Sequence, residues 1–230
     1  PFKFYRNEAR AVNIVVQIHP RGDQMLAECQ LIGHRSLPTQ TEPQTTTHFT
    51  ARVRLAKGPV PAKVASAFVA PSTDGIQAAD IYRIYFHGPA YQVLDEAWWD
   101  GTRAIGLFAN ALPPNHHPSE RPTLMAPRLI EFCFQTAGIW ELGAESRMGL
   151  PQHLLEVSLL REPSLAAGRL YAVVTRGTVE GTFNAEVLDK KGNCYLHLTG
   201  YQTVALPDAI DAQRLEKLRA IVPEDALVAV

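Results

Sequence analysis

The sequence predicts an α+β protein built from one long apolar helix and a set of antiparallel strands. Residues 127–142 have the length and the apolar content of a buried helix. The other apolar segments have the length of strands and are separated by turns, which use many of the 17 prolines and 15 glycines. Strands and helices do not alternate along the chain, so a doubly wound parallel sheet is not expected.

The composition is that of an ordinary globular protein, and it excludes several classes of partner. The 230 residues suffice for one sizeable domain or two smaller units, and 46% of them are hydrophobic. A formal net charge of −1 argues against binding to nucleic acid or to a membrane surface. No apolar run approaches the roughly 20 residues of a transmembrane helix.

The cysteines predict neither a metal site nor disulfide bonds. Cys29, Cys133 and Cys194 are an odd, scattered set without the spacing of metal ligands. They are typical of a protein of the reducing cytoplasm, where Cys133 would act as a small core residue. Glycine-rich phosphate loops and Gly-x-Ser-x-Gly elbows are also absent from the sequence.

The first 80 residues read as three strands followed by a linker. Residues 12–18 and 24–32 flank the turn-forming segment 20–23, so a hairpin is expected. Residues 37–47 are rich in Pro, Thr and Gln and predict a loop, whereas 48–55 alternate as a strand does. Residues 57–80 mix Ala, Pro, Gly and Ser and are interpreted as a linker.

The second part of the chain supplies the central helix and most of the strands. Aromatic residues between 81 and 94 surround a bend at Gly88-Pro89, and a strand is expected at 103–109. The central helix is expected at about 127–145, beginning at Pro127 after a proline-rich loop. Strands are predicted at 153–160, 169–175, 182–188 and 195–206, with a polar turn at 189–193. An amphipathic helix is expected at 208–222, within a C-terminal segment 208–230.

Glu131 and Gln135 are the polar exceptions in the central helix. They are four residues apart and therefore share one face, with Gly138 one turn further along. A carboxyl group inside an apolar helix is costly to ionise, so we expect the pKa of Glu131 to be raised. Such a group suits the role of a general acid. The alternative is a half-exposed helix with Glu131 and Gln135 on its solvent side.

The spacing Pro127-x-x-x-Glu131-x-x-x-Gln135 resembles the central helix of hot-dog-fold 3-hydroxyacyl thioester dehydratases. It is similar to the second half of the dehydratase domains of polyketide and polyunsaturated fatty acid synthases. Those domains usually read His-Pro-x-x-x-Asp-x-x-x-Gln, whereas Ala126 and Glu131 stand here at the His and Asp positions. Residues 87–91 resemble the Tyr-Gly-Pro-Ala-Phe signature of the same domains, with His87 where Tyr is common.

The resemblance implies a hot-dog fold, in which a curved antiparallel sheet wraps around a central helix. It further implies a double hot dog with an incomplete first half. Residues 1–56 would be the remainder of that first half, 57–80 the linker and 81–207 the second half. The activity implied is dehydration of 3-hydroxyacyl chains by a His base and the Glu131 acid. The alternatives are a non-catalytic scaffold that shapes the product and a hot-dog acyl thioesterase.

The resemblance also implies the partners of the chain. These are an acyl carrier protein, whose phosphopantetheine carries the substrate, and the neighbouring synthase domains. A homodimer is a further expected assembly. No metal, nucleotide or other cofactor is expected.

The expected site combines Glu131 and Gln135 with a histidine. His117 lies fourteen residues before Glu131, a separation similar to that in single-hot-dog dehydratases. His87 is the other candidate; each has a structural alternative, a solvated loop residue for His117 and a core histidine for His87. Backbone N–H groups at 128–130 are candidate donors to a substrate carbonyl, with contact to solvent as the alternative. A substrate channel is expected to be lined by Gly88, Pro89, Tyr91, Gln92, Pro127 and Gly138.

Overall fold

The computed structural model of the 230-residue chain describes residues 9–35, 42–58, 68–99, 102–121 and 123–206. The chain divides into two compact units, Pro1–Pro59 and Val60–Val230, and each is described by itself. The helix expected at 208–222 lies outside the described residues.

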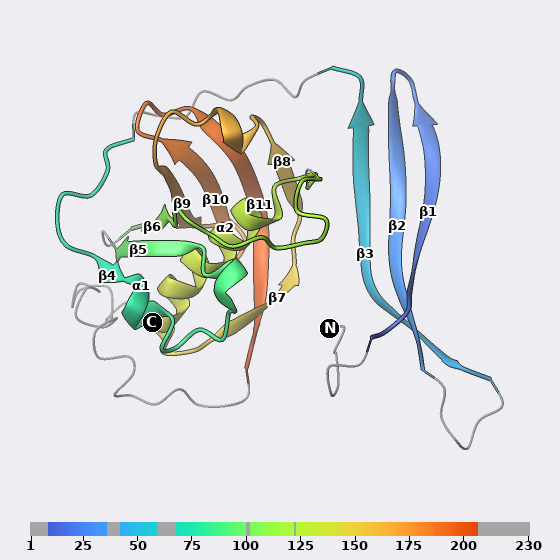
Figure 1. The fold of residues 1–230 in the computed structure, drawn as a ribbon, viewed down its shortest axis with the longest axis horizontal. Helices are drawn as coiled ribbons and strands as arrows, with labels where there is room; N and C mark the ends of the chain where they lie inside the picture. Colours follow the sequence, from blue (N-terminus) through green and yellow to red (C-terminus); the bar gives the residue numbers. More distant parts are fainter. Residues whose placement is uncertain (1–8, 36–41, 59–67, 100–101, 122, 207–230) are drawn as a thin grey trace. The chain divides into compact units, whose positions relative to one another are not determined.

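The first unit is a three-stranded antiparallel sheet in the order β1-β2-β3 (Figure 1). Its strands are β1 (Val12–Arg21), β2 (Gln24–Arg35) and β3 (Gln44–Ala56). The predicted hairpin is present, with a turn tighter than expected: Arg21 pairs with Gln24 across Gly22 and Asp23. Gly22 has φ +64°, a value that glycine adopts without steric cost. The expected loop at 37–47 is too long, since β3 already begins at Gln44.

One face of this sheet is apolar on all three strands. Residues on successive strands share a face when they are directly paired, and side chains alternate between the faces along each strand. The pairing places these apolar side chains together: Val12, Ile14, Val16 and Ile18 of β1, Met25, Ala27, Cys29 and Leu31 of β2, and Phe49, Ala51, Val53 and Leu55 of β3. Several of them, including Ile14 and Phe49, are exposed.

The second unit is a larger antiparallel sheet with one long helix packed on it (Figure 1). The strand order is β4-β5-β6-β9-β10-β11-β7, and β8 pairs with β11. The strands are β4 (Ile76–Gln77), β5 (Leu94–Trp99), β6 (Ala104–Phe108), β7 (Gly149–His153), β8 (Glu156–Leu159), β9 (Leu170–Arg176), β10 (Thr182–Asp189) and β11 (Cys194–Ala205).

The long helix α2 (Pro127–Trp140) forms the centre of the core. It begins with proline at its first position, as expected, and continues as a π-helical turn, η2 (Glu141–Glu145). Leu129, Phe132, Cys133, Ala137 and Ile139 are buried in a cluster with residues of β5, β6, β9, β10 and β11. The predicted α+β arrangement, one apolar helix on an antiparallel sheet, is therefore confirmed.

The opposite face of this sheet is also covered, which explains why its strands are apolar on both sides. Ile105 and Leu107 of β6 pack in a second cluster with Phe68, Trp98, Tyr171, Leu188 and Cys194. The segment from Phe68 to Thr73 contributes to this layer. Its Phe68 ring lies 5.0 Å from the Tyr171 ring, and the Thr73 carbonyl accepts a hydrogen bond from Trp98 Nε1.

Several predicted boundaries are wrong. Strand β5 was not expected, because Leu94–Trp99 does not alternate as a half-exposed strand would. The single strand expected at 153–160 is instead divided into β7 and β8, which pair with different parts of β11. The expected linker 57–80 contains β4 and the start of a short helix, α1 (Ala78–Ile81). Two single turns complete the unit, η1 (Pro89–Tyr91) and η3 (Pro163–Leu165).

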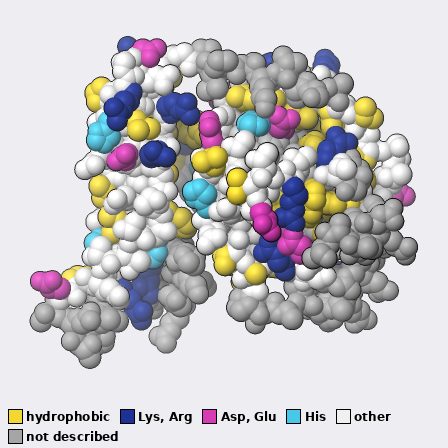
Figure 2. Space-filling model, turned by 180° about the vertical axis from the view of Figure 1, so that it is seen from behind, with side chains coloured by type: hydrophobic (Ala, Val, Ile, Leu, Met, Phe, Trp, Pro, Cys, Tyr) yellow, Lys and Arg dark blue, Asp and Glu magenta, His cyan; other side chains and the backbone are white. Residues whose placement is uncertain are grey.

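Charged side chains of both signs are interspersed on the surface. In the view of Figure 2, Lys and Arg side chains lie among Asp and Glu, without a large patch of one sign. This distribution agrees with the formal net charge of −1. None of the helices in the described ranges is long and apolar enough to cross a membrane.

Candidate active site

A cavity of about 250 Å³ lies beside one face of helix α2. The helix is not buried all round, as its composition suggested, because this face meets the cavity and not the sheet. The lining comes from four places in the chain: Glu131, Phe134, Gln135 and Gly138 of α2; Tyr85, Phe86 and His87; Met148, Gly149, Leu150 and Pro151; and Tyr201 of β11. Most of these side chains are apolar, and the acidic and basic groups among them are Glu131 and His87.

Glu131 and His87 are in direct contact at the cavity. Oε1 of Glu131 lies 3.0 Å from Nε2 of His87, and the side chains are 23% and 20% exposed, respectively. The carboxyl group is therefore neither enclosed in the core nor in open solvent. Of the two sequence interpretations of the helix, the structure supports an intermediate one, in which Gln135 is buried and Glu131 reaches the cavity.

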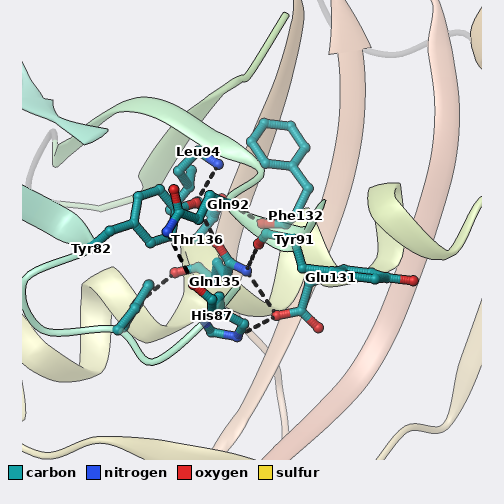
Figure 3. A network of polar contacts seen from close by, with 10 residues as sticks. Tyr82, His87, Tyr91, Gln92, Leu94, Glu131, Phe132, Gln135 and Thr136 are labelled. Atoms are coloured by element: carbon teal, nitrogen blue, oxygen red, sulfur yellow. Dashed lines mark hydrogen bonds and ion pairs between the residues drawn. The ribbon is translucent and has the colours of Figure 1, made fainter. Parts of the chain in front are cut away.

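Gln135 connects Glu131 to the backbone of the preceding loop (Figure 3). Its Nε2 donates to the Tyr91 carbonyl oxygen at 2.8 Å and to Glu131 Oε1 at 3.0 Å. Its Oε1 accepts a hydrogen bond of 2.8 Å from the Tyr82 hydroxyl. The Tyr82 hydroxyl in turn accepts one of 2.7 Å from the Leu94 backbone N–H. Because a backbone carbonyl can only accept and a backbone N–H can only donate, this network fixes the orientation of the Gln135 amide.

His87 is held by its neighbours in the bend at Gly88-Pro89. Its ring stacks on Phe86 with centroids 5.0 Å apart and meets the Tyr85 ring edge-on at 5.5 Å. Its backbone carbonyl accepts a hydrogen bond from Gln92 Nε2 at 3.1 Å. Ring atom Nδ1 is buried and has no hydrogen-bond partner among the described residues. The ring therefore has one nitrogen directed at Glu131 and the other enclosed by the protein.

Three tyrosines near the site remain uncharged phenols. Burial, more than any other influence, raises the pKa of Tyr82, Tyr85 and Tyr201, and the nearby Glu131 carboxylate raises each further. Tyr85 donates its hydroxyl to the Gln135 carbonyl oxygen at 2.8 Å. These side chains can therefore donate hydrogen bonds around the site but cannot serve as bases near neutral pH.

Comparison with known proteins identifies the family. Residues 72–213, which include the whole site, match the polyketide synthase dehydratase N-terminal domain. The chain belongs to the polyketide synthase dehydratase family. Curated protein sequences yield no match to it.

Solved structures of dehydratase domains share the fold at low sequence identity. The dehydratase domain of the CurF module of the curacin polyketide synthase is 16% identical, with a TM-score of 0.60 over 87% of this chain and 70% of its own. A trans-AT polyketide synthase dehydratase domain from Brevibacillus brevis is 15% identical, with a TM-score of 0.61 over 85% and 70%. The PpsC dehydratase domain from Mycobacterium tuberculosis is 19% identical, with a TM-score of 0.56 over 85% and 69%. The predicted hot-dog fold is confirmed by these matches.

Not every residue expected at the site of this dehydratase-family domain lies there. Glu131, Gln135, His87 and Gly138 line the cavity. His117 is an exposed residue of the proline-rich loop and does not line it. The other expected channel residues do not line it either, namely Gly88, Pro89, Tyr91, Gln92 and Pro127. Tyr91 and Gln92 instead contact residues of the site: the Tyr91 carbonyl accepts a hydrogen bond from Gln135, and the Gln92 amide donates one to the His87 carbonyl.

Two of the three backbone donors expected at the start of α2 are already occupied. The N–H groups of Leu129 and Ile130 donate to the Ala126 carbonyl oxygen at 2.8 and 3.3 Å. Ala126 adopts a left-handed conformation with φ +44°, which turns its carbonyl toward the helix. The expectation that the N–H groups at 128–130 are unpaired is therefore wrong for Leu129 and Ile130.

The sequence did not reveal Tyr82, Phe134, Tyr201 or the segment 148–151 as parts of the site. Aromatic residues around the bend were visible as a cluster, but no spacing rule connects them to Gln135 fifty residues later. Within the described part of the chain, His, Cys, Asp and Glu side chains form no group of three or more that could hold a metal ion. Cys29, Cys133 and Cys194 are not joined in disulfide bonds.

Proposed function

We propose that this domain dehydrates 3-hydroxyacyl thioesters carried by the acyl carrier protein of a polyketide or polyunsaturated fatty acid synthase, with Glu131 as the general acid. The observation that carries the proposal is the Glu131–His87 contact of 3.0 Å at the edge of an apolar cavity. This contact holds at the cavity a carboxyl group that can deliver the proton which water elimination requires.

The reaction requires one proton to be removed and another to be delivered. A base takes the proton from the carbon next to the thioester carbonyl, and that C–H electron pair forms the new double bond. The C–O bond at C3 breaks, and the hydroxyl leaves as water with the proton of the Glu131 carboxyl group. Oε2 of Glu131 accepts no hydrogen bond from the described residues, so it is free to face the substrate hydroxyl (Figure 3).

The lining of the cavity favours an acyl chain. Phe134, Met148, Leu150 and Tyr201 provide apolar contacts, and Glu131 and His87 are the acidic and basic side chains of the lining. A cavity of about 250 Å³ is smaller than those that enclose a whole drug-sized ligand, so it would take the acyl chain while the carrier arm stays outside. The structure of the PpsC dehydratase domain, which is similar in fold, is a complex with C12:1-CoA, an acyl thioester.

The test is a product assay with the full chain. A 3-hydroxyacyl thioester on acyl carrier protein should be converted to the enoyl thioester, and Glu131→Gln should reduce the rate by about 10²- to 10⁴-fold. Glu180→Gln is the matched control, because it makes the same chemical change at an exposed loop residue. An undiminished rate in the Glu131→Gln variant would exclude Glu131 as the acid.

The same assay separates the alternative functions. Release of the free 3-hydroxy acid in place of the enoyl thioester would identify an acyl thioesterase. Binding of the acyl carrier protein without any turnover would favour a non-catalytic domain that positions or shapes the chain.

A further inference from the structure

We propose that His87 positions the acid and does not act as the base of the reaction. In this inference His87 donates Nε2–H to Glu131 Oε1, and the proton that Glu131 delivers is thereby placed on Oε2. The inference rests on the proposed dehydratase function and assigns a role within the same site.

The first step of the argument is the fixed orientation of Gln135. The Tyr91 carbonyl can only accept, so the Gln135 amide nitrogen must face it. The Tyr82 hydroxyl accepts a hydrogen bond from the Leu94 N–H, and it therefore donates its own proton to Gln135 Oε1. The second N–H of the Gln135 amide therefore points at Glu131 Oε1, 3.0 Å away. One acceptor position of Oε1 is occupied whatever the state of His87.

The second step is the proton distribution on His87. Three arrangements are compatible with a 3.0 Å contact between Nε2 and Oε1: a neutral ring protonated on Nε2, a neutral ring protonated on Nδ1, and a doubly protonated ring. The last two place an N–H on Nδ1, which is buried without a partner among the described residues. A buried N–H without an acceptor is costly, and a charged one is more costly still. The neutral ring with its proton on Nε2 is therefore favoured.

The third step follows for Glu131. Oε1 then accepts two hydrogen bonds, one from Gln135 and one from His87, so both of its acceptor positions are filled. A proton on the carboxyl group must reside on Oε2, the oxygen that has no such partner and points away from His87 in Figure 3. The arrangement presents the acidic proton in a single direction.

The same arrangement removes His87 from the role of base. Its Nε2 already carries a proton and donates it to the carboxyl group. Its Nδ1 has a free lone pair, but that atom is enclosed by the protein and is out of reach of a substrate in the cavity. The proton next to the thioester carbonyl must therefore be taken by a group other than His87.

The activity test compares His87→Gln with His87→Phe. A glutamine at this position can still donate an N–H to Glu131 but cannot act as a base, whereas phenylalanine keeps a ring and loses the donor. For a positioning residue we expect His87→Gln to lower kcat less than about 10-fold and His87→Phe to lower it by about 10- to 100-fold. The acidic limb of the pH profile of kcat/KM should persist in His87→Gln, since it then belongs to another group. Equal losses of about 10²-fold or more in both variants, with loss of that limb, would overturn the proposal.

A second measurement does not depend on activity. Correlation of the ring protons and nitrogens by NMR, assigned with the His87→Gln variant, reports which nitrogen is protonated. At about pH 8 we expect the Nε2–H tautomer. An Nδ1–H tautomer or a doubly protonated ring would overturn the inference. If the wild-type chain forms no enoyl product, the proposed function fails, while the tautomer is still decided by this measurement.

Discussion

Two glutamates ten residues apart, at opposite ends of the same helical segment, have opposite environments. Glu131 is 23% exposed, contacts the cavity and keeps one carboxyl oxygen free of hydrogen bonds from the described residues. Glu141, at the start of η2, is fully buried. Its Oε1 accepts a hydrogen bond from Thr203 and lies 2.5 Å from Nη2 of Arg147.

The partners of the two residues indicate different roles, catalysis for Glu131 and stabilisation of the fold for Glu141. The partners of Glu131 are two neutral donors that hold one oxygen and leave the other available. The partners of Glu141 join the end of the helix to β11 and to the loop before β7, and Arg147 also contacts Glu145. Glu145 in turn pairs with Arg176 of β9. We therefore expect Glu131 to matter for turnover and Glu141 to matter for folding.

The largest effect on stability is expected from removing the buried carboxylate. Glu141→Ala removes the acceptor of the Thr203 hydroxyl and of Arg147 Nη2 and should lower the free energy of unfolding by about 3 kcal/mol. Glu131→Ala, at the cavity, should lower it by only about 1 kcal/mol. Urea unfolding of both variants, with the exposed Glu180→Ala as control, measures the difference. Equal losses of unfolding free energy in the Glu131 and Glu141 variants would contradict the proposed difference between the two residues.

A smaller loss is expected from crowding Glu141 without removing it. Gly149 has no side chain where Glu141 and Thr203 approach it, and a Cβ there would overlap Glu141 Oε2 and the Thr203 side chain. Gly149→Ala should therefore destabilise the fold by about 1–3 kcal/mol in urea unfolding. Gly88→Ala is the matched control, because a Cβ at position 88 meets no atom within 4 Å. A neutral Gly149→Ala would mean that the packing around Glu141 is loose.

A still smaller effect is expected when the hydrogen-bond network that holds Glu131 is weakened at Tyr82. Tyr82→Phe removes the hydroxyl between the Leu94 N–H and Gln135 Oε1, so the Gln135 amide loses one of the hydrogen bonds that orient it. We expect kcat to fall by about 10-fold. The assay for enoyl product measures this, with Tyr195→Phe as the control because its hydroxyl bonds to Asp189, away from the cavity. Unchanged turnover in Tyr82→Phe would show that the orientation of Gln135 does not matter.

The smallest predicted effect is a pH dependence that belongs to Glu141. Burial raises its pKa above the ordinary 4.5, although Thr203 and Arg147 offset part of the rise. The folded protein thus binds this proton more tightly than the unfolded chain does, so stability falls as the pH rises from about 4.5 through the folded pKa. Glu141→Gln removes this dependence. The stability of the wild type relative to Glu141→Gln should therefore decrease as the pH is raised, in urea unfolding at several pH values; a relative stability that increases would contradict the assignment.

Local patterns were sufficient for the helix and the hairpin but not for the whole sheet. The start of α2 follows from Pro127, and its central place follows from an apolar run too long to lie on a surface. The break between β7 and β8 could not be foreseen, because it depends on which part of β11 each strand pairs with. The strand β5 was missed for a similar reason: a strand covered on both faces loses the alternation that identifies strands.

The sequence by itself determined the central helix, the shared face of Glu131 and Gln135, and the likeness to dehydratases, because these depend on residues within a few turns of one another. Only the tertiary structure decided that His87, and not His117, meets Glu131, since forty-four residues and three elements separate that pair. It likewise decided the different environments of Glu131 and Glu141. The sequence pattern predicts that both residues lie in the helical segment. Neighbouring strands and loops determine which carboxyl group meets a cavity and which meets an arginine.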